Sequence, residues 1–457
     1  MKNLLLYLFL AASSTIFAQF SVGHRTITFN DPSRTGGFGS GGGAGRQIQT
    51  EIYYPATSAG NNVNVANGEF PVIVFGHGFA MSWDAYQNIW EHYVALGYIL
   101  AFARTEGSLI PSPSHNDFGL DLRLIGEKMT AENSNSASPF YQKINGNIAI
   151  MGHSMGGGAT ILAAANNANI KAIIGLAPAE TNPSAIAATP NVSVPAIIFS
   201  GSSDGVTPPA DHHIPIYNGL VSTCKTFVSI VGGGHCYYAN TNFNCDFGET
   251  TSSTGISITR AQQQARTFSL LDPWLEYMLK DSCDAYTQFS DLHESLQDNS
   301  PTTLAIQTTC ALNVSPAISL AISDLVTTEV GVTYQWFQNG EPIQGATSSI
   351  LNLPGTGTFT VQAFYSNGCS AMSAPYVLGG SGLTDLGSSI YRLSPNPTSG
   401  ILSIESANNM SVNVIVRNTD GQVVKTCVTS DEINISDLSN GLYILEINGI
   451  HHRIVKR

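Results

Sequence analysis

The chain has 457 residues, of which 43% are hydrophobic and 11% are charged, and its formal net charge at pH 7 is -13. That length excludes a single small domain, and the apolar content excludes wholesale disorder because it can fill real cores. The acidic balance disfavours nucleic-acid binding, since neutralising phosphates requires a basic surface. We therefore expect two to four globular modules.

The first 18 residues have the pattern of a secretory signal peptide. Lys2 provides a positive start, residues 4–12 form an apolar run, and the small residue Ala18 precedes Gln19. A membrane anchor is the alternative, but the run is far shorter than the ~20 residues that span a bilayer. We expect residues 1–18 to be removed and the mature protein to be soluble and exported.

Residues 19–300 are expected to form an α/β domain with a mostly parallel central sheet, because short β-rich runs alternate with longer helical patterns. Several runs are apolar without alternation, as in strands covered on both faces. The expected strands are residues 49–54, 70–75, 98–102, 147–151, 170–174, 194–200 and 225–231. The expected helices follow Ser82 and cover residues 120–129, 155–166, 211–220 and 260–279.

The segment Gly152-His153-Ser154-Met155-Gly156 has the G-x-S-x-G pattern of a nucleophile elbow. In this pattern a serine occupies a strained turn between a strand and a helix, and the flanking glycines leave room for the tight backbone. An expected strand precedes Gly152 and an Ala-rich helix follows Ser154. We therefore predict that Ser154 is a nucleophile.

A serine hydroxyl is a weak nucleophile at neutral pH, so it needs a histidine base and a carboxylate that orients the histidine. Asp204 and His235 each follow an expected strand, in the order Ser, Asp, His that is typical of α/β-hydrolases. We predict that they complete a triad with Ser154. Glu180 and Asp211 are the alternative acids.

The other histidines fit the role of base less well. None of them lies beyond Asp204 on a glycine-flanked loop directly after a strand, as His235 does. His212 and His213 begin an expected helix and should be solvated. The competing histidines are His77, His153, His212, His213, His451 and His452.

An oxyanion hole requires two backbone N–H groups, one from the residue after the nucleophile and one from the loop after an early strand. The first is expected from Met155. The second is expected from Phe79, which follows the strand at 70–75 in His77-Gly78-Phe79-Ala80. A plain core phenylalanine is the alternative interpretation of Phe79.

Seven cysteines remain after residue 18, so an odd number is available for disulfides in an exported protein. Cys236 and Cys245 are close enough to close a short loop. Cys310 could pair with Cys283 or with Cys369, and the spacing does not decide between them. No pair has the C-x-x-C spacing with nearby histidines that a zinc site needs, so we expect no metal.

Residues 311–378 are expected to form a β-sandwich with Trp336 in its core, because short strands are separated by turn residues. The Tyr-Gln-Trp segment at 334–336 and the Asn-Gly-Cys segment at 367–369 resemble the immunoglobulin-like (Ig-like) modules of secreted bacterial proteins. Such a module is a spacer or binds a polymer or a surface.

A Gly/Ser-rich linker is expected at residues 379–390, and a small β-sandwich at residues 391–457. The segment Ser394-Pro395-Asn396-Pro397-Thr398-Ser399-Gly400, the Gly441-Leu442-Tyr443 patch and the basic end resemble the C-terminal sorting domain of type IX secretion substrates. That resemblance implies a partner, the type IX secretion machinery at the outer membrane. An ordinary β-module is the alternative.

Several patches in one order occur across residues 70–240: Val72-Ile73-Val74-Phe75, the elbow with Gly157-Gly158, Leu176-Ala177-Pro178, Pro195-Ala196-Ile197-Ile198-Phe199, Ile214-Pro215-Ile216-Tyr217 and Gly233-Gly234-His235. They resemble the cutinase-like polyester hydrolases, a family that includes PET-degrading enzymes. The resemblance implies that Phe79, Met155, Ala179 and Val206 line the substrate cleft.

The sequence departs from that family at two places. Ala179 stands where the family commonly has a tryptophan, so one wall of the aromatic clamp is missing, and Tyr237 and Tyr238 are candidates to replace it. Gly201 and Ser202 stand where the resemblance would place one cysteine of a disulfide between the acid and histidine loops.

Together these features predict a secreted serine carboxylic-ester hydrolase that needs no cofactor and acts as a monomer. We expect a cutinase-like polyesterase able to cleave polyesters such as PET. A small-molecule esterase or lipase is one alternative. A surface binding protein, with the function in residues 311–378 and a vestigial hydrolase core, is the other.

Overall fold

A computed structural model describes residues 20–296, 303–321, 324–327, 331, 333–352, 354–379, 391–406, 412–418, 422–429, 431–447 and 450–457. The predicted signal peptide and all but the first residue of the predicted linker lie outside these residues. Two compact units are present, residues up to 376 apart from 355–358, and residues 377–457 together with 355–358. None of the described helices combines the length and the apolar character that crossing a membrane requires.

The first unit contains an 11-stranded sheet whose longest path runs β11-β10-β9-β8-β7-β5-β6-β3-β1-β4. The six strands from β10 to β6 are mutually parallel, and β3, β1 and β11 extend them in antiparallel pairing. Its strands are β1 Ser21–Asp31, β2 Gly37–Phe38, β3 Arg46–Ala56, β4 Gly60–Asn61, β5 Phe70–Gly76, β6 Ile99–Ala103, β7 Ile144–His153, β8 Ala172–Leu176, β9 Ala196–Gly201, β10 Lys225–Ile230 and β11 Leu304–Thr308.

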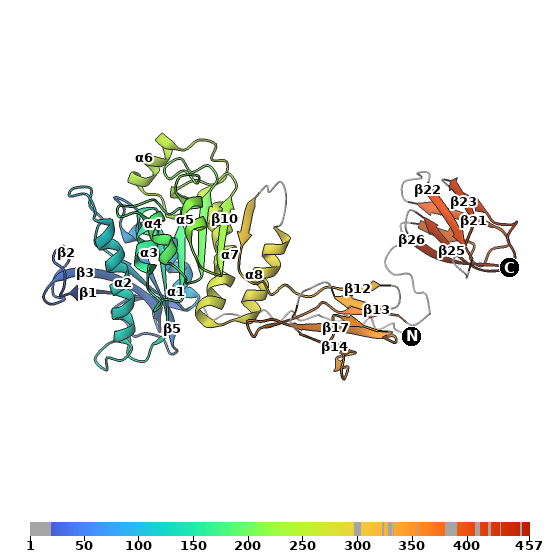
Figure 1. Ribbon diagram of the computed structural model, residues 1–457, viewed down its shortest axis with the longest axis horizontal. Coiled ribbons are helices and arrows are strands. Elements are labelled where there is room, and N and C mark those ends of the chain that lie inside the picture. Colours follow the sequence, from blue (N-terminus) through green and yellow to red (C-terminus); the bar gives the residue numbers. More distant parts are fainter. Residues whose placement is uncertain are drawn as a thin grey trace, which may run out of the picture. The chain divides into compact units, whose positions relative to one another are not determined.

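Helices cover both faces of this sheet (Figure 1), and each face has its own apolar core. Helices α2, α3 and α5 pack on one face, whereas α1, α7 and α8 pack on the other. β5 is buried along its whole length, as expected for a β-branched strand covered on both sides. The helices are η1 Trp83–Tyr86, α1 Gln87–Ala95, α2 His115–Glu132, α3 Met155–Ala164, α4 Ala185–Ala188, η2 Thr189–Asn191, α5 His213–Gly219, η3 Cys236–Tyr238, α6 Phe243–Ser252, α7 Arg260–Lys280 and α8 Cys283–Ser295.

This architecture confirms the predicted α/β-hydrolase class with a mostly parallel sheet. Each of the seven expected strands is present, with ends shifted by a few residues. β1, α6 and α8 were not predicted from the sequence. β11 pairs with β10 and lies beyond residue 300, so the sheet continues past the predicted end of the domain.

Antiparallel sheets follow the α/β domain, as the sequence predicts. Strands β12 Ile318–Ala321, β13 Asp324–Thr327 and β16 Ile350–Leu351 form one sheet, and Trp336 on β14 of the next is fully buried. That second sheet contains β14 Thr333–Gln338, β15 Glu341–Pro342, β17 Gly357–Phe364, β18 Ser370–Met372 and β19 Tyr376–Leu378.

The second unit places a three-stranded and a four-stranded antiparallel sheet around one apolar core. Leu402 and Ile433 enter this core from the first sheet, and Val414 and Leu445 enter it from the second. The strands are β20 Tyr391–Ser394, β21 Ile401–Ser406 and β24 Glu432–Asn434, then β22 Val412–Arg417, β23 Val423–Thr429, β25 Gly441–Ile447 and β26 Ile450–Lys456.

Three disulfides are present. Cys236–Cys245 closes the short loop that the spacing suggested. The two options for Cys310 are both wrong, because Cys310 pairs with Cys224 and Cys283 pairs with Cys369. The reason is β11, which brings Cys310 back to the start of β10. Cys427 is a free thiol.

Candidate active site

Ser154 occupies a sharp turn between β7 and α3, with φ 56° and ψ -121°. This left-handed φ is strained for a residue with a side chain. The flanking glycines are required by space: a Cβ on Gly152 would lie 2.1 Å from the carbonyl oxygen of Gly156, and one on Gly156 would lie 2.1 Å from that of Gly76. The elbow, residues 152–156, is therefore formed as predicted.

Asp204 and His235 form a buried pair at the ends of β9 and β10. His235 Nδ1 lies 2.7 Å from Asp204 Oδ2. The second carboxylate oxygen accepts hydrogen bonds from the backbone N–H groups of Val206 and Thr207. Burial raises the pKa of Asp204, but the hydrogen bond and charge of His235 outweigh it and hold that pKa below its usual range. Asp204 is thus a carboxylate that can orient His235.

His153 joins the elbow to His235. Its Nε2 is 3.0 Å from the His235 carbonyl oxygen, and the two rings lie 4.8 Å apart. Burial, together with the charge of His235, lowers the pKa of His153 to about 3, so this ring is neutral and structural. Among the described residues the Ser154 hydroxyl donates to no acceptor, and Ser154 is 8% exposed.

The amides of Phe79 and Met155 are both free. Neither N–H donates a hydrogen bond to any described part of the chain, whereas the neighbouring Gly78 N–H donates to Tyr86 Oη at 2.8 Å. Tyr86 Oη is also 2.9 Å from His153 Nδ1. It therefore links the elbow to residues 77–82, which we call the Phe79 loop. Phe79 is 47% exposed, which excludes a plain core role.

A second buried histidine supports the acid. His213 was expected to be solvated, but it is fully buried; its Nδ1 is 2.8 Å from Ser200 Oγ and its Nε2 is 3.0 Å from Thr207 Oγ1. Thr207 Oγ1 lies 3.0 Å from Asp204 Oδ2. Burial lowers the pKa of His213 to about 3, so the ring is neutral.

These contacts fit one direction of hydrogen bonding. If Thr207 donates to the carboxylate of Asp204, its oxygen accepts from His213 Nε2–H, and His213 Nδ1 then accepts from Ser200. Every proton in the chain points towards Asp204. His212, in contrast, is half-buried and accepts the backbone N–H of Glu180.

Among the described residues, neither alternative acid forms a hydrogen bond or ion pair with His235. The Glu180 carboxylate accepts the N–H of Ile186 at the start of α4, and Asp211 is exposed. His77 is buried and bonded to the carbonyl oxygens of Gly78 and Thr105. His451 and His452 belong to β26 in the second unit.

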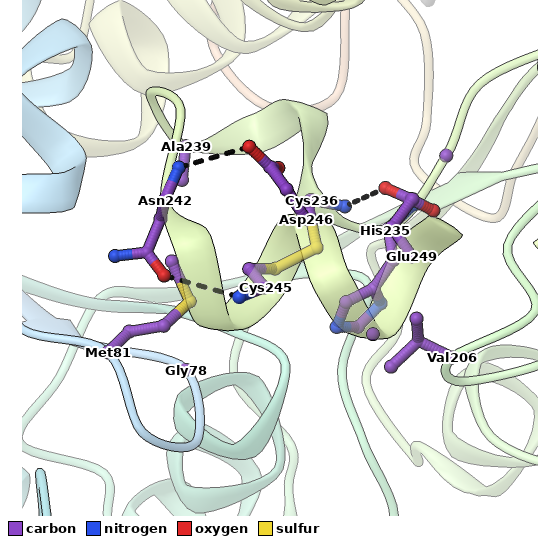
Figure 2. The surroundings of a disulfide bond; sticks show 12 residues. Gly78, Met81, Val206, His235, Cys236, Ala239, Asn242, Cys245, Asp246 and Glu249 are labelled. Atoms are coloured by element: carbon purple, nitrogen blue, oxygen red, sulfur yellow. Dashed lines mark hydrogen bonds between the residues drawn. A yellow bond between two sulfur atoms is a disulfide. The ribbon is translucent and has the colours of Figure 1, made fainter. Parts of the chain in front are cut away.

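The residues expected to line the cleft lie next to different parts of the site. Ala179 donates its N–H to the Ser154 carbonyl at 2.9 Å, and Val206 lies beside His235 (Figure 2). The two tyrosines that could replace the tryptophan make different contacts. Tyr238 is buried against His153, and the ring of Tyr237 lies 4.7 Å from the Arg260 guanidinium.

One group of potential metal ligands occurs among the described residues. Side-chain atoms of His153, His235 and Cys245 lie within 4.8 Å of one another. However, the Cys245 sulfur is joined to Cys236, and His235 Nδ1 bonds Asp204, so the thiolate and one imidazole nitrogen that a metal would need are already engaged.

Sequence reasoning missed the helix that holds the histidine loop, residues 231–238. Glu249 of α6 is buried, and its two carboxylate oxygens accept the backbone N–H groups of His235 at 2.8 Å and Cys236 at 2.6 Å. The Cys236–Cys245 disulfide joins the same loop to α6 (Figure 2). The two cysteines were the available signal for this contact.

Comparison with known proteins gives two family matches. Residues 12–257 match the model of PET hydrolase-like proteins, and residues 390–457 match that of secretion system C-terminal sorting domains. The sorting domain indicates that the chain is exported by type IX secretion.

Curated relatives match the same N-terminal region. A cutinase of Thermobifida alba, est1, is 27% identical over 207 residues, covering 44% of this chain and 60% of the relative. A bis(hydroxyethyl) terephthalate hydrolase of Streptomyces coelicolor is 26% identical over 207 residues, covering 45% and 57%. The chain thus spans about three fifths of the length of these relatives. Because the family model covers more than half of the chain, the protein belongs to the PET hydrolase-like family.

Proposed function

We propose that this chain is an exported serine carboxylic-ester hydrolase with Ser154 as nucleophile, His235 as base and Asp204 as the acid that orients the base. The observation that carries the proposal is the buried His235–Asp204 pair, 2.7 Å apart, beside a strained serine elbow. Its relatives named as cutinases and as a terephthalate ester hydrolase support ester cleavage.

The chemistry follows an acyl-enzyme route. Ser154 Oγ attacks the ester carbonyl carbon while His235 Nε2 takes its proton, and the same proton then passes to the leaving alcohol. Water, activated by His235, attacks the acyl-serine, releases the carboxylic acid and restores Ser154. Asp204 keeps His235 in the required tautomer and stabilises the imidazolium.

The free N–H groups of Phe79 and Met155 are the proposed oxyanion hole. Donors that are already fixed before the reaction stabilise the tetrahedral oxyanion without reorganisation. The N-terminus of α3 adds positive potential at Met155. These residues, with Ala179 and Val206, are proposed to line the cleft.

We propose that the substrate is a polyester, aliphatic or aromatic, such as PET. We also propose that the catalytic domain begins after residue 18 and runs through β11, that residues 311–378 are an Ig-like spacer, that 379–390 are a linker and that 391–457 are the sorting domain. We propose that the protein acts as a monomer.

Labelling of the full chain with a fluorophosphonate tests the site. We expect the label on Ser154 by mass spectrometry, and Ser154→Ala should lower kcat/KM for a short p-nitrophenyl ester by about 10⁴-fold or more. A label on another serine would contradict the assignment. Soluble product from polycaprolactone and amorphous PET film tests the substrate class: release from neither film, with the soluble ester still cleaved, would favour a small-molecule esterase.

A further inference from the structure

Helix α6 contacts the histidine loop and lies at the top of the α/β domain in Figure 1, beyond the ends of the sheet's strands. Its inward face is fixed twice, by the Cys236–Cys245 disulfide and by Glu249, which accepts the N–H groups of His235 and Cys236 (Figure 2). The helix is therefore held rigidly next to the proposed base.

Both ends of α6 reach the loops that carry the proposed cleft residues. Asn244 Nδ2 donates to the Ala80 carbonyl at 2.7 Å, next to Phe79. At the other end Ser253 Oγ accepts the N–H of Gly205 at 2.9 Å, next to Val206. The helix thus extends from the Phe79 loop to the acid loop, residues 201–207, and forms a continuous border with both.

The outward face of α6 carries two free aromatic rings. Phe243 is 83% exposed and Phe247 is 63% exposed, and their ring centroids lie 6.3 Å apart with an angle of 23° between the rings. The helical period of 100° per residue places both on the side opposite Cys245 and Glu249. Rings in this position add nothing to the core, so folding does not account for them.

This face also lacks free charge, although the whole chain is acidic. Asp246 is paired with Arg260 at 2.6 Å, and Glu249 is buried. The other exposed residues of the helix are all uncharged: Asn244, Thr250, Thr251 and Ser252. A neutral, apolar partner fits such a face, whereas a charged one gains no ion pair from it.

We propose that Phe243 and Phe247, together with the exposed ring of Phe79, form an aromatic surface by which α6 adsorbs to the surface of a solid, neutral polyester beside the cleft. The proposal rests on the proposed ester hydrolase function. Because the two rings project from a convex helix face, they suit a flat polymer surface better than a small soluble ester, which a concave site would enclose. Aromatic rings would then contact substrate at α6 in place of the ring that Ala179 lacks.

The test compares the full chain with the double variant Phe243→Ser/Phe247→Ser. Adsorption to amorphous PET and polycaprolactone films is measured by depletion from solution, and product release from the films is compared with kcat/KM for p-nitrophenyl butyrate. We expect film affinity to fall about tenfold, which corresponds to about 1.4 kcal/mol. The ratio of film rate to soluble-ester rate should fall by a similar factor. Phe243→Trp/Phe247→Trp should restore both.

Val221→Ser is the matched control. Val221 is 54% exposed and lies before β10, at the end of that strand opposite His235, so film affinity should not change. Unchanged adsorption of the double serine variant would overturn the proposal. An equal loss on film and soluble ester would also overturn it, because α6 would then act only through His235.

The design separates this proposal from the proposed function. Adsorption that depends on the two rings, without product from either film, would retain the aromatic surface but contradict polyester cleavage. If the parent chain forms dimers and the double serine variant does not, the rings belong to an interface between two copies. If the parent binds neutral phosphatidylcholine vesicles more tightly than film, the rings bind lipid. Either result overturns the polymer assignment.

Discussion

The two sides of the proposed site are built in different ways. The elbow is compact in sequence, since Gly152, Ser154 and Gly156 lie within five residues, and hard contacts with backbone atoms of the elbow and of β5 dictate which residues fit. The acid and histidine loops are built from distant parts of the chain. Glu249 holds His235 from α6, and His213 supports Asp204 from α5.

This difference predicts two kinds of substitution: those in the elbow, which the site needs in order to form, and those around the acid and histidine loops, which change how well it works. A change in the elbow meets backbone that cannot move, so its effect should be large and should affect folding and activity together. A change around the two loops removes a hydrogen bond and leaves the fold in place. We expect such changes to give smaller, graded losses that act mainly on kcat.

The largest effect is expected from Gly156→Ala. Its Cβ would lie 2.1 Å from the Gly76 carbonyl oxygen and 2.3 Å from the carbonyl carbon, so β5 or α3 must shift. We expect a loss of about 3 kcal/mol in the free energy of unfolding and at least about a 100-fold loss of ester hydrolysis. Thermal unfolding and p-nitrophenyl ester assays measure the two.

Gly248→Ala is the matched control for that substitution. Gly248 lies inside α6 with no atom within 4 Å of an added Cβ, so alanine should stabilise the protein by about 0.5–1 kcal/mol. Equal melting temperatures for the two variants would show that backbone crowding does not govern the elbow.

A medium effect is expected from Glu249→Gln. In the parent, both carboxylate oxygens of Glu249 accept a backbone N–H. The amide of the variant keeps one acceptor oxygen, but its NH₂ group faces the second backbone N–H, so two donors meet. We expect the variant to lose about 2 kcal/mol in the free energy of unfolding, as for hydrogen bonds to a charged group, and kcat to fall with little change in KM. Glu69→Gln, at an exposed position, should change neither; a wild-type kcat for Glu249→Gln would remove the role of α6 in holding His235.

The local side of the site could be predicted from the sequence for a physical reason. The glycines at 152 and 156 belong to a short pattern that marks the turn in the sequence, although the atoms that crowd Gly156 come from β5. Asp204 and His235 were identified by their places after apolar strands, because strand ends in a parallel sheet meet at one edge. Their pairing at 2.7 Å agrees with that inference.

The distant side left little local signal. α6 contains Asn, Asp, Gly and three Thr or Ser residues with low helix propensity, so no helical period marks it, and its stability comes from the disulfide and from Glu249. His213 was expected to be solvated because, with His212, it begins an expected helix. Only the packing of α5 on β9 shows that it enters the core and bonds Ser200.

The next prediction concerns His213 and the chain of donors that ends on Asp204. His213→Leu removes the Nε2 donor to Thr207, and we expect kcat to fall about tenfold, equivalent to roughly one hydrogen bond. His213→Gln can donate to Thr207 and accept from Ser200, so it should recover most of the loss. Asp211→Asn, on the exposed side of the same segment, is the control. Equal kcat values for the leucine and glutamine variants would contradict the donor chain.

The last prediction concerns acid stability. Burial lowers the pKa of His153 and of His213 from 6.5 to about 3, so between these values the unfolded chain binds protons that the folded chain does not. Stability therefore falls as the pH drops below about 6.5, by about 1.4 kcal/mol per pH unit for each histidine once the unfolded form is protonated. The lowered pKa of Asp204 acts in the same sense but at lower pH, because its contribution is complete above its unfolded value near 3.8 and is lost only below it.

The window between pH 6 and pH 4 thus isolates the two histidines from Asp204. Urea unfolding at pH 7, 6, 5 and 4 should give a shallower pH dependence of the free energy of unfolding for His213→Gln than for the parent. The difference should equal the contribution of the one proton that binds His213 in the unfolded chain. The comparison uses the difference between two full-length chains, so acid groups elsewhere cancel. Parallel curves would mean that His213 binds its proton as readily in the folded protein as in the unfolded chain. The donor chain towards Asp204 would then contain a charged ring beside the carboxylate.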